Sequence, residues 1–343
     1  LAGAEIIFNL SASDELIGKE AYRRQLVRQK SATNACAYVY TGSGFGESST
    51  DLVFSGTAII AENGSQLATS ERFSFKEQLI IADIDVQRLQ ADRLRNSAFI
   101  IGNQNPNKKN EFETISLNNL GANNIYSEPS DVTRTFAPHP FVPPEDEMTT
   151  RCNEIFSIQV GGLATRLFHT GIKKAVVGIS GGLDSTLALL VMVKTFDKLG
   201  LPRENIVGIT MPGFGTTGRT YNNSLNMMKS LGVTIKEVDI KPACLQHLKD
   251  IDHDLSILDV SYENTQARER TQILMDYANK IGGLVVGTGD LSELVLGWAT
   301  YNGDHMSMYA VNTSIPKTLV RYMVKYAALY EMDEAAKETL LDV

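Results

Sequence analysis

Residues Val176–Thr186, Val-Val-Gly-Ile-Ser-Gly-Gly-Leu-Asp-Ser-Thr, join an apolar, β-branched segment to a helix through a loop with few side chains. Apolar residues recur at helical spacing from Thr186 to Lys194, so the segment before the loop is predicted to be a strand and the one after it a helix. Gly181 and Gly182 let backbone N–H groups come close to a ligand. Because the N–H groups and the positive end of the helix dipole point to one place, this segment predicts a phosphate-binding loop.

Composition limits the class of protein. The 343 residues, 43% of them hydrophobic and 21% charged, are typical of a globular protein and predict two domains. A net charge of −8 argues against general affinity for nucleic acid. No apolar run approaches the roughly 20 residues that span a bilayer, which predicts a cytoplasmic protein without a membrane segment. The chain starts inside an apolar segment without Met and stops without a tail, so we expect it to be part of a longer protein.

The first half mixes strands with one helix, and a polar stretch from about residue 102 to 144, rich in Asn, Ser and Pro, follows it as a linker. Asn63-Gly64 predicts a hairpin turn. The expected elements are strands at Ile6–Leu10, Ala37–Tyr40, Val53–Ile60 and Leu79–Ile84, and a helix at Ala21–Asn34.

The second half alternates strands and helices, which predicts a parallel sheet with helices on both faces. The expected strands are Ala175–Ile179, Ile206–Met211, Thr234–Asp239 and Leu284–Gly287, and the expected helices are Met148–Phe168, Thr186–Lys198, Tyr221–Leu231 and Tyr262–Lys280.

The loop at Ser180–Ser185 lacks the Gly-Lys-Ser/Thr of the common phosphate loop. It resembles instead the Ser-Gly-Gly-x-Asp-Ser signature of the ATP pyrophosphatases, which split ATP into AMP and pyrophosphate. The resemblance implies that Ser180, Gly181, Gly182, Asp184 and Ser185 hold the pyrophosphate. A glycine-rich turn in an ordinary Rossmann-like unit is the alternative.

Two further clusters carry polar and aromatic side chains. Glu263–Arg270 places Arg268 and Arg270 near the start of a helix, where they can bind phosphate or form a solvated helix face. Gly287–Asp304 runs from a strand end through a helix into an aromatic loop with the chain's only tryptophan, Trp298, which can be a core residue or a platform for an aromatic ring.

These clusters, with Thr210–Thr217 and Val311–Thr318, resemble the glutamine-dependent NAD synthetases. The resemblance implies that the carboxylate of deamido-NAD attacks ATP and that ammonia then displaces AMP. Ammonia-dependent members have a lysine where this chain has Tyr301, so contacts with deamido-NAD differ there.

The resemblance also implies residue roles. ATP is assigned to Gly178, Ile179, Ser180, Gly181, Gly182, Leu183, Asp184, Ser185, Thr288 and Lys317, and magnesium to Asp184 and Glu293. Deamido-NAD is assigned to Asn264, Arg268, Glu293, Trp298, Ala299, Thr300 and Tyr301.

The segments around Asn9–Ser13, Gly18-Lys19 and Gly46–Leu52 resemble the C-terminal part of a nitrilase-type amidase domain, which hydrolyses glutamine through a Glu, Lys and Cys set. The resemblance places the nucleophilic Cys before the start of this chain and assigns glutamine to Ser13 and Lys19. Ser13 as a turn or cap residue is the alternative. Cys36 enters a predicted buried strand and is interpreted as structural.

We therefore expect an α/β protein with a partial nitrilase-like α-β-β-α domain at 1–125, a linker at 126–147 and a doubly wound, Rossmann-like ATP pyrophosphatase domain at 148–343. The predicted activity is glutamine-dependent NAD synthesis with ATP and Mg²⁺, in a homo-oligomer. A different glutamine-fed ligase, such as GMP or asparagine synthetase, and a nucleotide-binding module without turnover are the alternatives.

Overall fold

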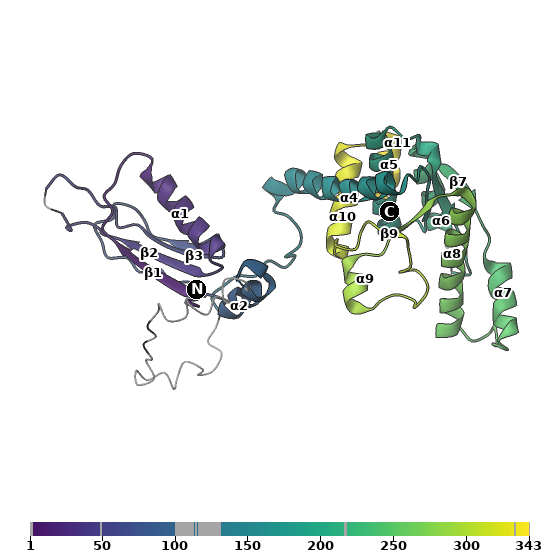
Figure 1. The fold of residues 1–343 in the computed structure, drawn as a ribbon, viewed down its shortest axis with the longest axis horizontal. Coiled ribbons are helices and arrows are strands. Elements are labelled where there is room, and N and C mark those ends of the chain that lie inside the picture. The colour runs from purple at the N-terminus through teal and green to yellow at the C-terminus, as the bar shows by residue number, and fades with distance from the viewer. Residues whose placement is uncertain are drawn as a thin grey trace. The chain divides into compact units, whose positions relative to one another are not determined.

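The computed structural model describes residues 3–48, 50–99, 113, 115, 132–215, 218–332 and 334–342. The chain divides into two compact units, Leu1–Phe136 and Ala137–Val343 (Figure 1). Most of the polar stretch expected at 102–144, and residues 126–131 of the expected linker, lie outside the described residues. None of the described helices is both long and apolar enough to cross a membrane.

The first unit is a four-stranded sheet of order β1-β2-β3-β4, with β1 parallel to β2 and the other pairs antiparallel. Helix α1 packs Val27 against Tyr40 and Ile59 on one face. Asn63 and Gly64 have φ values of 45° and 86° in the β3–β4 turn, which confirms the predicted hairpin turn. The elements are β1 Ile6–Ser11, α1 Lys19–Thr33, β2 Ala37–Gly42, β3 Ala58–Glu62, β4 Ser65–Thr69 and α2 Val86–Arg95.

Two strand predictions in this unit were wrong. The strand expected over Val53–Ile60 begins only at Ala58, and Leu79–Ile84 is not a strand. After the two-residue turn, β4 pairs directly with β3. The free edge of β3 is then occupied, and Leu79–Ile84 cannot pair there. Leu79 and Ile81 are largely exposed, although they belong to a short apolar run that is typical of a strand.

The second unit contains a parallel sheet of order β7-β6-β5-β8-β9, which confirms the predicted doubly wound sheet. The chain builds outward from β5 to β6 and β7, and then returns to place β8 and β9 on the other side. The strand order therefore reverses between β5 and β8, where open α/β sheets bind ligands. The strands are β5 Ala175–Gly178, β6 Ile206–Thr210, β7 Thr234–Glu237, β8 Leu284–Gly287 and β9 Tyr309–Ala310.

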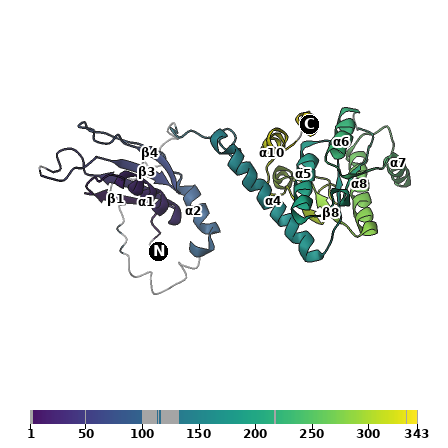
Figure 2. The same ribbon diagram turned by 90° about the horizontal axis from the view of Figure 1, so that it is seen from above.

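Helices cover both faces of this sheet (Figure 2). Ala175 and Val177 join one core with α4, α5 and α10, whereas Val176 joins a second core with residues of α7 and α8. Helix α7 was not predicted; Pro242 stands in its first turn, where proline is tolerated. The helices are η3 Glu145–Glu147, α4 Met148–Thr170, α5 Leu183–Leu199, η4 Arg203–Asn205, α6 Gly218–Ser230, α7 Lys241–Asp250, α8 Val260–Ile281, α9 Leu291–Leu296, α10 Lys317–Tyr330 and α11 Glu334–Leu341.

Candidate active site

A cleft of about 580 Å³ opens at the carboxyl ends of β5, β6 and β8, at the point where the strand order reverses. Residues of α8 and of the segment after α9 complete its wall. Eight of the predicted site residues line it, and these are Gly178, Ile179, Ser180, Asp184, Ser185, Thr288, Glu293 and Ala299.

The loop after β5 brings its backbone against α6. Gly181 has a φ of 82°, and a Cβ added there would lie 2.2 Å from the carbonyl oxygen of Thr220, so only glycine fits. The Ser180 hydroxyl accepts a hydrogen bond from the N–H of Gly182 at 3.2 Å. Gly182 is the N-cap of α5 and has no side chain to cap the first N–H groups. These N–H groups are the donors of the predicted phosphate loop.

Three carboxylates surround one lysine at the edge of the cleft. The Lys317 ammonium donates a hydrogen bond to Asp184 and lies 3.4 Å from Asp290 Oδ2 and 4.0 Å from Glu293 Oε1. Asp184 lies in the first turn of α5, Glu293 belongs to α9 and Lys317 begins α10. The fold therefore brings together three predicted residues that are far apart in the sequence.

Asp290 and Glu293 are oriented by a capping box at the start of α9. Asp290 Oδ1 accepts from the N–H of Glu293 at 2.9 Å, and Glu293 Oε2 accepts from the N–H of Asp290 at 3.0 Å. One oxygen of each carboxylate is thus used by the helix, and the other is the one nearest to Lys317. Asp290 was not predicted as a site residue; its position three residues before a glutamate is the signal of a capping box.

Burial and like charges act together on these groups. Burial raises the pKa of Asp184, and the neighbouring Asp290 adds to this effect, although Lys317 opposes it. Burial likewise raises the pKa of Glu293, with Asp184 and Asp290 contributing. Burial alone would lower the pKa of Lys317, but its hydrogen bond to Asp184 and the surrounding carboxylates raise it. The cluster has an excess of negative charge that one lysine does not balance.

The donor set fits a hard divalent cation. One oxygen from each of Asp184, Asp290 and Glu293 lies within 4.8 Å of the others. Asp184 Oδ1 and Asp290 Oδ2 are buried and have no hydrogen-bond partner. Carboxylate oxygens are the ligands that Mg²⁺ prefers, and buried carboxylates are stable when paired or bound to a metal.

Residues predicted to bind the dinucleotide also lie together. The Thr300 hydroxyl donates to Asn264 Oδ1 at 2.8 Å, and Arg268 Nε donates to the Tyr301 carbonyl at 3.0 Å. Helix α8 thereby holds the loop after α9. Trp298 is 80% exposed, which excludes the alternative that it is a core residue.

Arg270 lines the cleft, so it does not belong to a solvated helix face. Its Nε donates to the Met211 carbonyl at 3.4 Å, and burial lowers its pKa. No carboxylate among the described residues forms an ion pair with it. Arg268 is exposed on the same helix and contacts the loop after α9, so the two arginines of this cluster differ in burial.

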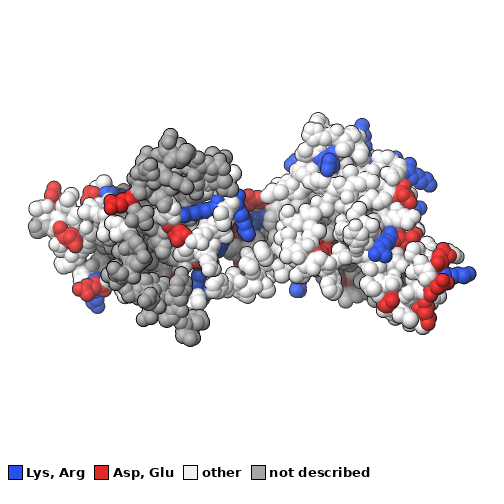
Figure 3. Space-filling model, turned by 60° about the horizontal axis from the view of Figure 1, so that its bottom comes forward, with Lys and Arg blue, Asp and Glu red and all other residues white. Residues whose placement is uncertain are grey.

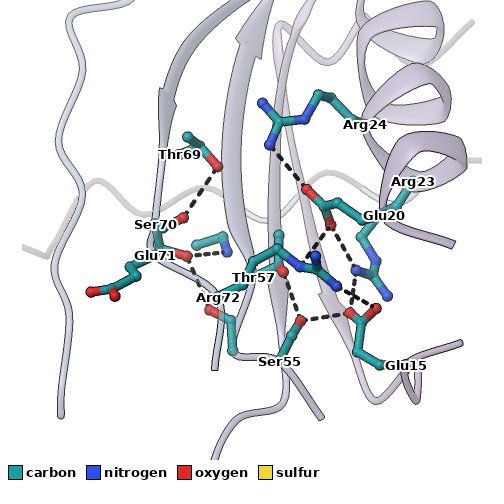
Figure 4. A network of polar contacts seen from close by, with 12 residues as sticks. Glu15, Glu20, Arg23, Arg24, Ser55, Thr57, Thr69, Ser70, Glu71 and Arg72 are labelled. Atoms are coloured by element: carbon teal, nitrogen blue, oxygen red, sulfur yellow. Dashed lines mark hydrogen bonds and ion pairs between the residues drawn. The ribbon is translucent and has the colours of Figure 1, made fainter. Parts of the chain in front are cut away.

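In the first unit, Glu15 lies in a buried network of ion pairs and hydrogen bonds (Figure 4), between Ser13 and Lys19 in the sequence. Glu15 accepts hydrogen bonds from Arg23 at 2.5 Å, from the Ser55 hydroxyl at 2.5 Å and from Arg72 at 3.1 Å. Lys19 instead pairs with Asp14 at 2.7 Å. The network fixes the segment that carries both predicted glutamine-binding residues.

We expect Glu15→Gln to destabilise the first unit by about 3 kcal/mol, because the buried Arg23 guanidinium loses its buried carboxylate partner and keeps only Glu20. Urea unfolding followed by far-UV circular dichroism measures the change in the free energy of unfolding. Trp298 fluorescence reports the second unit and should keep its midpoint. Asp14→Asn, in the more exposed pair with Lys19, is the control and should change much less. Equal effects of the two substitutions would contradict the role of burial.

Cys36 is fully buried, and burial raises the pKa of its thiol, which is the opposite of what a nucleophile needs. The structure thus supports its interpretation as a structural residue.

On the face drawn in Figure 3, basic and acidic side chains are interspersed over the described residues of the second unit, without a continuous basic surface there.

Comparison with known proteins supports the arrangement. Residues 156–332 match the NAD synthase family. A glutamine-dependent NAD(+) synthetase of Mycobacterium leprae is 41% identical over 357 aligned residues, which cover 100% of this chain and 51% of that protein. The chain thus spans about half the length of the curated relatives it matches.

Two solved structures share the fold. A glutamine-dependent NAD+ synthetase of Acinetobacter baumannii in complex with ADP superposes with a TM-score of 0.50 at 23% identity, covering 98% of this chain and 53% of that one. A glutamine-dependent NAD(+) synthetase of Cytophaga hutchinsonii superposes with a TM-score of 0.51 at 19% identity, covering 99% and 54%.

Proposed function

The chain belongs to the NAD synthase family, and we propose that it carries out ATP-dependent amidation of deamido-NAD, with glutamine as the nitrogen donor in the whole protein. The observation that carries the proposal is the cleft at the reversal of strand order, where a phosphate-binding loop faces a lysine and three carboxylates. The relatives named glutamine-dependent NAD synthetases and the ADP complex of one of them support it.

The proposed reaction has two steps. A carboxylate oxygen of deamido-NAD bonds to the α-phosphorus of ATP while the bond to the β-phosphate oxygen breaks, and pyrophosphate leaves. Ammonia then bonds to the carbonyl carbon, the bond to AMP breaks, and a proton is released. Negative charge grows on the leaving pyrophosphate, so groups that already point at this position accelerate the reaction.

The residues of the chain divide the work as follows. The N–H groups after Gly181 bind the phosphates, and Lys317 supplies a positive charge to them. Asp184, Asp290 and Glu293 would hold Mg²⁺, which when bound neutralises phosphate charge. Asn264, Arg268 and the loop from Trp298 to Tyr301 hold deamido-NAD, with the exposed indole available to an aromatic ring.

The first unit is proposed to be the C-terminal part of a nitrilase-like glutaminase domain, with Ser13 and Lys19 against glutamine. Two observations support this assignment. Its segments resemble a nitrilase-type amidase domain, and the relatives named glutamine-dependent NAD(+) synthetases align over the whole chain. A homo-oligomer in the cytoplasm completes the proposal; light scattering coupled to size-exclusion chromatography tests the oligomer.

The proposal is tested with ATP, Mg²⁺, deamido-NAD and an ammonium salt, while AMP and NAD are quantified by chromatography. We expect both products in equal amounts, and none when deamido-NAD is omitted. Replacing deamido-NAD with xanthosine monophosphate or aspartate tests GMP and asparagine synthesis. ATP binding without AMP formation from any of these acceptors would favour a binding module instead.

A further inference from the structure

We propose that Asn312 is a positioning residue that sets the separation between the two halves of the cleft, the phosphate loop after β5 and the segment after β8. Its effect on catalysis rests on the proposed function. Its effect on nucleotide binding can be measured without turnover.

The backbone itself does not hold these two halves together. Strands β5 and β8 pair only at Ala175 with Leu284 and at Val176 with Val285. Beyond these pairs, β5 continues against β6 alone and β8 against β9 alone, and each then turns into a loop that lines the cleft. The distance between the loops therefore depends on groups other than the sheet hydrogen bonds.

The Asn312 side chain joins the two halves at this place. Its Nδ2 donates to the carbonyl oxygen of Asp184 at 3.0 Å and to that of Thr288 at 3.1 Å. Asp184 belongs to the first turn of α5, and Thr288 follows β8. Both hydrogens of one planar amide are used, so the two carbonyl groups are held at a fixed separation.

The orientation of this amide is fixed from the other side. Asn312 is completely buried, and Gln159 of α4 is 7% exposed. Gln159 Nε2 donates to Asn312 Oδ1 at 3.1 Å and to the Val311 carbonyl at 2.9 Å. Because the Asn312 oxygen accepts from Gln159, its NH₂ group must face the two carbonyl groups.

The separation matters because the site is shared between the two halves. Asp184 comes from one side and Glu293 from the other, and their oxygens must stay close enough for one cation. The loop that carries Asn312 leads into α10, which begins at Lys317 five residues later. A displacement of about 1 Å in such a site can reduce a rate about 100-fold.

Asn312→Ser tests the inference in the whole protein, since serine is polar but too short to reach both carbonyl groups. We expect kcat for AMP formation to fall about 100-fold, with a change in the ATP KM of less than tenfold. Binding of α,β-methylene-ATP with Mg²⁺, measured by calorimetry, should weaken several-fold. Asn312→Asp keeps the size but turns an acceptor toward both carbonyl groups, so it should be at least as impaired.

Thr195→Val is the matched control, because Thr195 is equally buried and its hydroxyl bonds only within α5. It should lower the melting temperature without changing kcat or analogue binding. If Asn312→Ser folds and matches this control in both measurements, the inference is overturned. If the unaltered protein binds the analogue but forms no AMP, the proposed function fails alone, and the binding comparison decides the role of Asn312. If it binds no analogue, both fail.

Discussion

Asp184→Asn and Glu293→Gln are each expected to reduce Mg²⁺-dependent AMP formation by at least about 1,000-fold, the scale of losing a group that stabilises charge in a transition state. Both substitutions keep the shape of the side chain and remove one negative charge from the proposed cation site. Glu293→Gln also keeps an oxygen that can accept from the N–H of Asp290, so the start of α9 is preserved.

The melting temperature without Mg²⁺ separates loss of chemistry from loss of fold. Three carboxylates lie around one ammonium group, so neutralising one of them removes repulsion. We expect both variants to melt at the same temperature as the unaltered protein or higher. AMP formation equal to that of the unaltered protein would show that these carboxylates do not hold the metal.

Lys317→Met is expected to lower kcat/KM for ATP by about 100- to 1,000-fold, because the phosphates lose a positive charge inside the cleft. The same substitution frees three carboxylates from their competing cation, so binding of Mg²⁺ alone should be tighter. Steady-state kinetics and a calorimetric Mg²⁺ titration measure the two effects. This opposite response of rate and metal affinity distinguishes Lys317 from the carboxylates.

Arg166→Met is the control for this experiment, because it removes a positive charge from α4, where Arg166 lies over the Tyr309 ring and does not line the cleft. We expect it to change neither quantity by more than a factor of two or three. A Lys317→Met variant with full activity would refute contact between this lysine and ATP.

Much of the second unit could be predicted because its signals are local. A buried parallel strand is a short apolar run, and the turn from β5 into α5 requires glycine where the backbone passes the Thr220 carbonyl. Local patterns of this kind place the phosphate loop and the end of β8. The doubly wound order then brings both to one edge of the sheet.

The errors and omissions have non-local causes. Leu79–Ile84 is a short apolar run like that of a strand, but a strand forms only beside a free neighbour, and β4 already occupies that position beside β3. In the sequence, Asp290 is recognisable only as a helix cap. Its second carboxylate oxygen is placed beside Lys317 by the fold, which no local pattern predicts. Asn312 is a single polar residue whose three partners lie 24 to 153 positions away.

The capping box of α9 makes helix initiation and ligand geometry a single event. Asp290 and Glu293 use one oxygen each to start the helix, and the same bonds aim the remaining oxygens at the cleft. If the first turn of α9 unravels, two of the three carboxylates that we propose as cation ligands lose their orientation together. The two carboxylates are therefore either both oriented or both released. Lengthening or shortening either acidic side chain would disturb the start of α9 and the orientation of the free oxygens at the same time.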